Sequence, residues 1–189
     1  MPMIRETIVS TVDGEGRAHF APLGIIAEGD GWIIAPFRPS KTLENLGVVP
    51  FAIANFTDDV RVFAGCLTGR RDWPTAAREG FAVPRLAGAL AHSELAVTRR
   101  TEDEQRPRFH CRVLRTVSHG PFRGFNRAQA AVIEAAILVS RLHMLPREKV
   151  EREIAYLEIA VSKTAAPAEE EAWSWLTQAI RAFYANTAR

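Results

Sequence analysis

Two hydroxyl groups and two cations lie close together in one short segment, Arg38-Pro39-Ser40-Lys41-Thr42. The segment follows a predicted strand over residues 32–37 and opens a predicted helix over residues 41–46, which Ser40 is placed to cap. Unpaired N–H groups at a helix N-terminus and the helix dipole both favour an anion. Charge-assisted hydrogen bonds from Arg38 and Lys41 would strengthen such a site. The segment therefore predicts a phosphate site, although its spacing is equally typical of a capped surface helix whose cations face water.

A proline and a glycine interrupt the predicted strand over residues 18–26, within the run His19-Phe20-Ala21-Pro22-Leu23-Gly24. Proline has no N–H for the strand ladder, so its presence indicates an edge, a bulge or a bend. Glycine within a strand often marks the close approach of a ligand to the backbone. Taken alone, the run fits a structural bulge at the corner of a barrel slightly better than a ligand contact.

The other reactive side chains lack the spacing of a metal site or of a nucleophilic site. Four histidines are scattered, and we expect each of them to be an exposed or half-buried side chain. Three consecutive carboxylates are expected in a solvated loop. Two cysteines are too few and too far apart for a disulfide framework or a zinc site. These residues are His92, His110, His119, His143, Glu102, Asp103, Glu104, Cys66 and Cys111.

Short segments before residue 121 alternate apolar and polar residues between turn signals, the pattern of an antiparallel sheet. Gly47 is expected to end the first helix. Several strands joined by hairpins favour a small barrel, because closure removes exposed sheet edges. Strands are predicted over residues 4–12, 18–26, 32–37, 51–56, 90–100 and 109–118, and short helices over residues 41–46 and 60–68.

After Pro121 the pattern becomes helical. Asn126 can cap a helix over residues 127–142, and Pro146 begins a second helix at its favoured first turn. Glu169 and the two glutamates after it open a third helix, where carboxylates complement the helix dipole. The predicted fold class is therefore α+β, mainly β, with a barrel over residues 1–120 and a helical domain over residues 121–189.

The composition is that of an ordinary globular protein. A chain of 189 residues can bury one good core and a small second one. The 24 basic and 22 acidic residues leave a net charge of +2, which gives no field strong enough to indicate nucleic acid. No apolar run is long enough to cross a bilayer, and the first residues lack the layout of a signal peptide. We therefore expect a cytoplasmic protein that binds neither nucleic acid nor membranes.

In their order and spacing, these segments resemble the FMN-binding split-barrel proteins, which include flavin reductases and pyridoxamine-phosphate-oxidase-like proteins. The resemblance rests on Ala21-Pro22-Leu23-Gly24, then Ser40-Lys41-Thr42-Leu43-Glu44-Asn45, then the strand Phe51-Ala52-Ile53-Ala54-Asn55. It is greatest for a flavin-reductase-like branch that also carries Phe125-Asn126-Arg127-Ala128 before a long helix. The likeness covers essentially the whole chain, so it implies a split β-barrel with a C-terminal helical domain.

The resemblance also implies a role for individual residues toward FMN. Hydroxyls and cations would hold its phosphate, with Lys41 and Thr42 at a surface pocket, and the backbone of residues 21–24 would lie along the isoalloxazine. Three polar residues would bond the ribityl chain or organise the pocket wall, and two more would reach the flavin from a second subunit. In chain order the implied residues are Thr11, His19, Ala21, Pro22, Leu23, Gly24, Arg38, Ser40, Lys41, Thr42, Asn45, Asn55, Asp58, Asn126 and Arg127.

Five of these residues also have a purely structural interpretation. Asn45 could simply end its helix and Asn55 its strand. Asp58 and Asn126 could each cap the helix that follows. Arg127 could only pair with a carboxylate.

The function that the resemblance implies is a flavin-dependent oxidoreductase working as a homodimer. NAD(P)H would bind transiently over the flavin, because the chain has no separate glycine-rich dinucleotide fingerprint, and the acceptor would be a small molecule. The helical domain would pack on the barrel or at the dimer interface. Two alternatives remain open: a non-catalytic flavin carrier or sensor, and an interaction module that binds no flavin.

Overall fold

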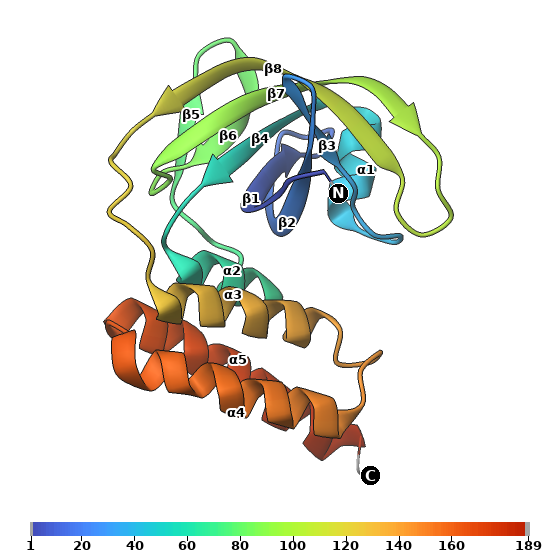
Figure 1. The fold of residues 1–189 in the computed structure, drawn as a ribbon. Coiled ribbons are helices and arrows are strands. Elements are labelled where there is room, and N and C mark those ends of the chain that lie inside the picture. The colour runs from blue at the N-terminus through green and yellow to red at the C-terminus, as the bar shows by residue number, and fades with distance from the viewer. Residues whose placement is uncertain (1, 188–189) are drawn as a thin grey trace. The chain divides into compact units, whose positions relative to one another are not determined.

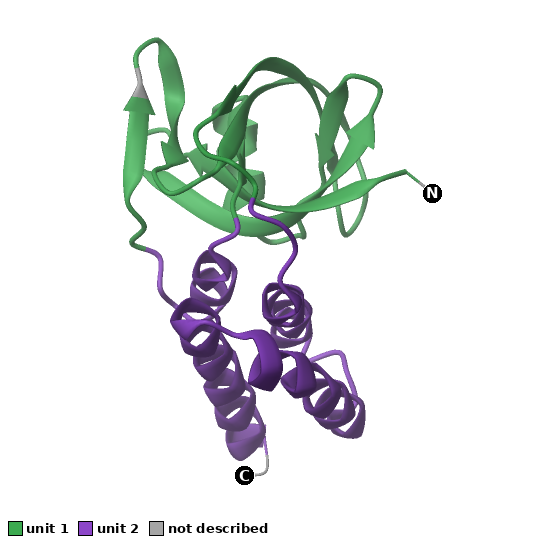
Figure 2. Cartoon of the chain, turned by 60° about the vertical axis from the view of Figure 1, so that its left-hand side comes forward, with its two compact units in different colours: residues 1–57, 72–122 green, residues 58–71, 123–189 purple. Residues whose placement is uncertain are grey.

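The computed structural model describes residues 2–187, apart from the side chain of Arg78. The chain forms two compact units, the first from residues 1–57 and 72–122 and the second from residues 58–71 and 123–189. Figure 2 shows the first unit as mainly strands and the second as helices. Residues 58–71 thus belong to the helical unit, although they lie within the range 1–120 expected for the barrel.

The first unit is a closed six-stranded barrel, which confirms the predicted fold class. Its strand order is β1-β2-β3-β8-β7-β4, and every neighbouring pair is antiparallel (Figure 1). The barrel strands are β1 (Ile4–Val12), β2 (Ala18–Glu28), β3 (Gly31–Ile34), β4 (Phe51–Phe56), β7 (Ala91–Thr101) and β8 (Arg108–Ser118).

Alternate residues of these strands fill the barrel, as the period of two in a strand requires. The buried cluster includes Val9, Ile25, Ala54 and Leu95. The helix α1 (Lys41–Val48) contributes Leu46 to the same cluster. This helix runs through Gly47 instead of ending there, because Gly47 does not adopt the positive φ of a helix-ending glycine.

A hairpin that the sequence did not predict covers part of the outside of the barrel. Its strands are β5 (Thr75–Arg78) and β6 (Phe81–Leu86), which pair only with each other. Val83 of the hairpin is fully buried and packs with Val12 and Ile53 from β1 and β4. The hairpin therefore buries the outward-facing side chains of two barrel strands.

The second unit consists of four helices, α2 (Val60–Leu67), α3 (Arg127–Ser140), α4 (Arg147–Thr164) and α5 (Pro167–Thr187). Their apolar faces share one buried cluster, which includes Val60, Ala135, Val161 and Trp173. Asn126 caps α3 as predicted, and its side chain accepts hydrogen bonds from the N–H groups of Ala128 and Gln129. Across residues 2–187, no helix combines the length and the apolar character needed to span a membrane.

Candidate functional site

The N-terminus of α1 has the geometry of an anion site. The Ser40 hydroxyl accepts a hydrogen bond from the Leu43 N–H at 3.3 Å, and the Ser40 carbonyl accepts one from the Glu44 N–H at 3.2 Å. The two preceding N–H groups, those of Lys41 and Thr42, have no hydrogen-bond partner among the described residues. Two unpartnered donors at the positive end of the helix dipole favour an anion.

The two cations of this segment differ in how freely they can move. The Lys41 ammonium lies 3.4 Å from the Glu44 carboxylate, and its side chain is 47% exposed, so the contact is a weak surface pair. Arg38 is held more tightly. Its guanidinium donates to Glu102 at 2.6 Å and to the Asp103 carbonyl at 3.2 Å. Lys41 is therefore the cation available to a ligand, while Arg38 fixes the loop between β7 and β8.

A polar group of the barrel lies beside α1. Thr11 of β1 stands opposite His19 of β2 in the strand register. The Asn45 amide donates to the Thr11 hydroxyl at 3.0 Å, and Asn45 is 1% exposed. Its amide oxygen is buried and has no hydrogen-bond partner in the part of the chain that the structure describes, a state that costs about 1–3 kcal/mol when nothing fills it. An unsatisfied acceptor at this position points to a water or a ligand group.

The burial of Thr42 corrects one expectation. We expected Thr42 at a surface pocket beside Lys41, but its side chain is 2% exposed. Thr42 lies on the face of α1 that also carries the buried residues Asn45 and Leu46, because positions three and four apart share one helix face. Thr42 can thus offer a ligand its N–H group, and substitution of its side chain would perturb packing.

The edge of β2 next to residues 20–25 carries no partner strand. β3 pairs only with residues 26–28 of β2. The Ala27 N–H bonds to the Met3 carbonyl at 2.8 Å, so in this antiparallel pair the odd-numbered residues of β2 direct their polar groups toward β1. Phe20, Pro22 and Gly24 consequently direct theirs toward the open edge. Pro22 is at an edge, where its missing N–H breaks no ladder bond.

Packing within the barrel itself explains why residue 24 is a glycine. A Cβ atom at this position would lie 2.8 Å from Cγ2 of Ile4 and 2.9 Å from Oε1 of Glu6. Side chains of the neighbouring strand β1 therefore occupy the space above Gly24, and the close approach that we expected from a ligand comes from the protein. The in-plane edge of Gly24 stays open.

Both the amide nitrogen and the amide oxygen of Asn55 form hydrogen bonds within the barrel unit. Its amide nitrogen donates to the Ile8 carbonyl at 2.8 Å and to the Ser10 hydroxyl at 3.0 Å. Its amide oxygen accepts from the Leu86 N–H at 2.7 Å. Asn55 therefore links β4, β1 and β6, a role more extensive than that of a residue at a strand end.

Three further candidates belong to the helical unit. The Asp59 side chain, and not that of Asp58, caps α2 by accepting from the Arg61 N–H at 3.1 Å. Asn126 caps α3 and also donates to the Thr164 carbonyl at 3.0 Å, so both halves of its amide are used. Arg127 is exposed and lines a groove between α3 and α4.

The structure brings together two histidines that are far apart in the sequence, a pairing that the sequence did not predict. His92 of β7 and His119, just beyond β8, have parallel rings, and Nδ1 of His92 lies 2.8 Å from Nε2 of His119. Their meeting depends on the β7–β8 register, which two irregularities shift. Within the described part of the chain, no three His, Cys, Asp or Glu side chains are grouped to hold a metal ion.

Comparison with models of protein families assigns the chain to a family. Two models described as protein of unknown function (DUF447) match it, the N-terminal domain over residues 5–120 and the second over residues 126–178. The chain belongs to the DUF447 family. No curated protein matches this DUF447 sequence.

Solved structures share the fold. An FMN-bound DUF447 protein from Methanosarcina mazei is 24% identical, with a TM-score of 0.82 over 95% of this chain and 96% of that one. The styrene monooxygenase flavin reductase of Pseudomonas putida is 16% identical, with a TM-score of 0.52 over 61% of this chain and 82% of that one. The 2-nitrobenzoate 2-nitroreductase of Pseudomonas fluorescens is 17% identical, with a TM-score of 0.52 over 63% and 66%. The barrel thus has the split-barrel fold that is also found in flavin reductases.

Proposed function

We propose that this DUF447 protein binds FMN, with the phosphate at the N-terminus of α1. The observation that carries the proposal is the pair of N–H groups of Lys41 and Thr42, unpartnered among the described residues, beside the exposed Lys41 ammonium. The FMN-bound structure of the Methanosarcina mazei family member supports the same ligand class. A phosphate carries the charge and the acceptor oxygens that this arrangement favours.

The residues present fit the rest of the cofactor. The open edge of β2 offers the N–H groups of Phe20 and Gly24 and the carbonyl of Pro22, which suit the polar edge of an isoalloxazine. The buried amide oxygen of Asn45 offers an acceptor for a hydroxyl. Thr11 and His19 lie in register next to Asn45 and would line the pocket wall. The roles of Asp58, Asn126 and Arg127 toward FMN stay predictions.

We further propose that the protein is a flavin-dependent oxidoreductase. Bound FMN would supply two-electron redox chemistry, while the protein supplies binding, orientation and exclusion of competing reactions. NAD(P)H would be the transient electron donor and a small molecule the acceptor. The likeness of the barrel to flavin reductases supports this reading. We also propose a homodimer, in which a second subunit would lie beside each flavin.

Flavin binding is tested by purification and by one charge substitution. The purified protein should be yellow, and added FMN should raise its melting temperature. Lys41→Ala should weaken FMN binding roughly 10- to 100-fold, because a charge-assisted hydrogen bond contributes about 1.5–3 kcal/mol. Lys149→Ala removes the same charge from an exposed surface pair on α4 and should leave the affinity unchanged. Folded protein that stays colourless with excess FMN and is not stabilised by it would contradict the proposal.

Catalysis is tested separately from binding. Anaerobic mixing of the FMN-loaded protein with NADH or NADPH should bleach the flavin absorption. If the flavin stays oxidised with both donors, the protein is a flavin carrier or sensor, and the binding result stands. Sedimentation of the loaded protein measures the expected dimer.

A further inference from the structure

The barrel unit contains a cavity that the flavin proposal does not use. It has a volume of about 200 Å³ and lies between the β5–β6 hairpin and the outer face of the barrel strands. One part of its wall is apolar and the rest is charged or polar. The lining residues are Ile53, Ala76, Ala77, Arg85, His92, Glu94, Arg115, Val117 and His119.

Two of the polar lining residues are deeply buried. The side chains of His92 and Glu94 are 6% and 2% exposed, and their nearest side-chain atoms, Nε2 and Oε1, are 3.7 Å apart. Burying such groups is costly unless they meet polar partners. A cavity that keeps an imidazole and a carboxylate in its wall is therefore built as a polar site and not as a packing defect.

The two histidines of the cavity act as one uncharged unit. Their rings are parallel within 4°, with centroids 5.0 Å apart, and Nδ1 of His92 lies 2.8 Å from Nε2 of His119. Such a bond needs one donor and one acceptor, so the two imidazoles are not both protonated. Burial lowers the pKa of His92, and burial and the Arg85 charge lower the pKa of His119. Both rings are consequently neutral at neutral pH.

With a neutral histidine pair, the lining side chains that the structure describes carry one positive charge in excess. Arg85 and Arg115 contribute two positive charges against the one negative charge of Glu94. Arg85 is anchored, because its Nη1 donates to the carbonyls of Leu86 and Ala87 at 3.0 and 2.9 Å. A guanidinium has five N–H donors, so the others remain for a ligand. Arg115 stands opposite Glu94 in the β7–β8 register.

We propose that this cavity binds a small organic carboxylate, whose charged end meets Arg85 and Arg115 while its carbon chain faces Ile53 and Val117. A guanidinium recognises a carboxylate through two parallel hydrogen bonds, and a monoanion neutralises the excess charge of the lining. The volume suits an acid of roughly four to seven non-hydrogen atoms. The site does not depend on flavin binding, because none of its lining residues belongs to α1 or to the open edge of β2.

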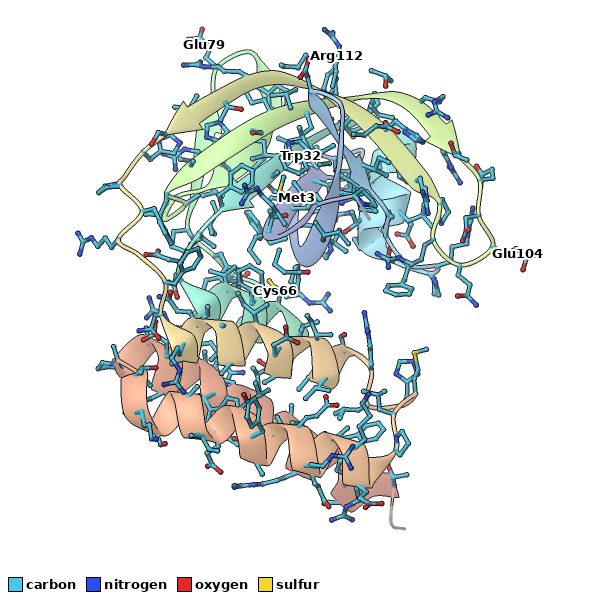
Figure 3. The ribbon with its side chains drawn as sticks, in the orientation of Figure 1. Met3, Trp32, Cys66, Glu79, Glu104 and Arg112 are labelled. Atoms are coloured by element: carbon cyan, nitrogen blue, oxygen red, sulfur yellow. The ribbon has the colours of Figure 1, made fainter. Side chains whose placement is uncertain are left out.

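Binding is measured on the full chain by following the imidazole nitrogen resonances of His92 and His119 during titration with sodium butyrate. We expect saturable shifts of both side chains. Arg115→Gln should weaken butyrate binding roughly tenfold. Arg112→Gln is the matched control, since Arg112 lies on the same strand, is exposed and points away from the barrel in Figure 3. Absence of saturable shifts, or equal weakening by both substitutions, would overturn the site.

Two further arms test the ligand class. Ala76→Leu fills the apolar wall and should weaken butyrate binding more than formate binding, because formate has no carbon chain to place there. Circular dichroism would confirm that each variant is folded. If inorganic phosphate or chloride shifts the two histidines as strongly as butyrate at equal ionic strength, the cavity binds anions in general and the carboxylate assignment is wrong.

Discussion

At the residue scale, two asparagines of the barrel unit have opposite degrees of internal bonding. Both Asn45 and Asn55 are almost fully buried, and each ends one of the segments on which the resemblance to split-barrel proteins rests. Asn55 uses its donor and its acceptor, whereas the oxygen of Asn45 has no partner. A side chain that stabilises the barrel by itself should be fully satisfied, whereas one that awaits a ligand should not.

This difference predicts unequal effects of alanine substitution. Asn55→Ala should lower the free energy of unfolding by about 3 kcal/mol, because it leaves the Leu86 N–H unpaired in the interior and removes the side-chain bonds to Ile8 and Ser10. Asn45→Ala should cost about 1 kcal/mol, because it removes one hydrogen bond and one unsatisfied oxygen. Urea denaturation without FMN measures both values. Equal losses in the two variants would show that the Asn45 oxygen already has a partner.

The paired histidines predict a pH dependence of stability. The pKa values of His92 and His119 are lowered in the folded state, so the unfolded chain binds protons more tightly near its ordinary histidine pKa of 6.5. Stability should therefore be full above pH 6.5 and fall as the pH drops through the lowered values. His92→Gln should flatten this decline, while His143→Gln, an exposed histidine, should not. Denaturation curves between pH 7.5 and about 5 measure the slopes. A decline as steep in His92→Gln as in the wild type would contradict the assignment.

Single residues were predictable where their partners are local. Ser40 and Asn126 cap the helices that begin one residue later, as their types and positions indicated. Arg38 was predicted to face a phosphate, but its carboxylate partner Glu102 lies 64 residues away in sequence. The burial of Thr42 likewise depends on packing that no local pattern encodes.

At the element scale, the barrel strands were predicted almost to the residue where turn signals bound them, as for β1 and β4. The β5–β6 hairpin was missed, because its first strand, Thr75-Ala76-Ala77-Arg78, has neither β-branched alternation nor aromatic residues. The strand β3 also ends at Ile34, three residues earlier than predicted. Register irregularities in β7 and β8 decide which side chains meet, and these irregularities have no signature in sequence.

The α3 cap predicts a measurable effect within the helical unit. Asn126→Ala should lower the free energy of unfolding by about 2 kcal/mol, since it removes the cap and the bond to the Thr164 carbonyl. Asn126→Asp keeps the cap but loses the donor to Thr164, so its loss should be smaller. Chemical denaturation followed by helical circular dichroism measures both variants. An aspartate variant as unstable as the alanine variant would mean that the Thr164 bond carries the effect.

At the scale of the whole molecule, the helical unit is built from two separate stretches of chain. The helix α2 supplies Val60 and Ala64 to a core that otherwise comes from residues after 127. Sequence patterns placed α2 with the barrel because it lies between two barrel strands, and only the packing of its apolar face assigns it to the helices. A boundary drawn at residue 120 does not follow the hydrophobic core.

This division predicts the outcome of truncation. A chain ending at residue 122 should bind a hydrophobic dye and aggregate, because the apolar face of α2 loses its cover. Replacing Val60, Ala64 and Leu67 by serine in the truncated chain should reduce both signals. Light scattering and dye fluorescence report the result. A truncated chain that stays monomeric without these substitutions would show that α2 does not need the C-terminal helices.

The split origin of the helical core has a consequence during synthesis. As the polypeptide leaves the ribosome, α2 emerges when no residue of α3, α4 or α5 has yet been translated. Its apolar face therefore stays uncovered while four more strands and the helix α3 are synthesised. Chaperones that shield nascent apolar segments would consequently act on this protein early, at residues 60–67, and release it only once the helices that cover α2 have been made.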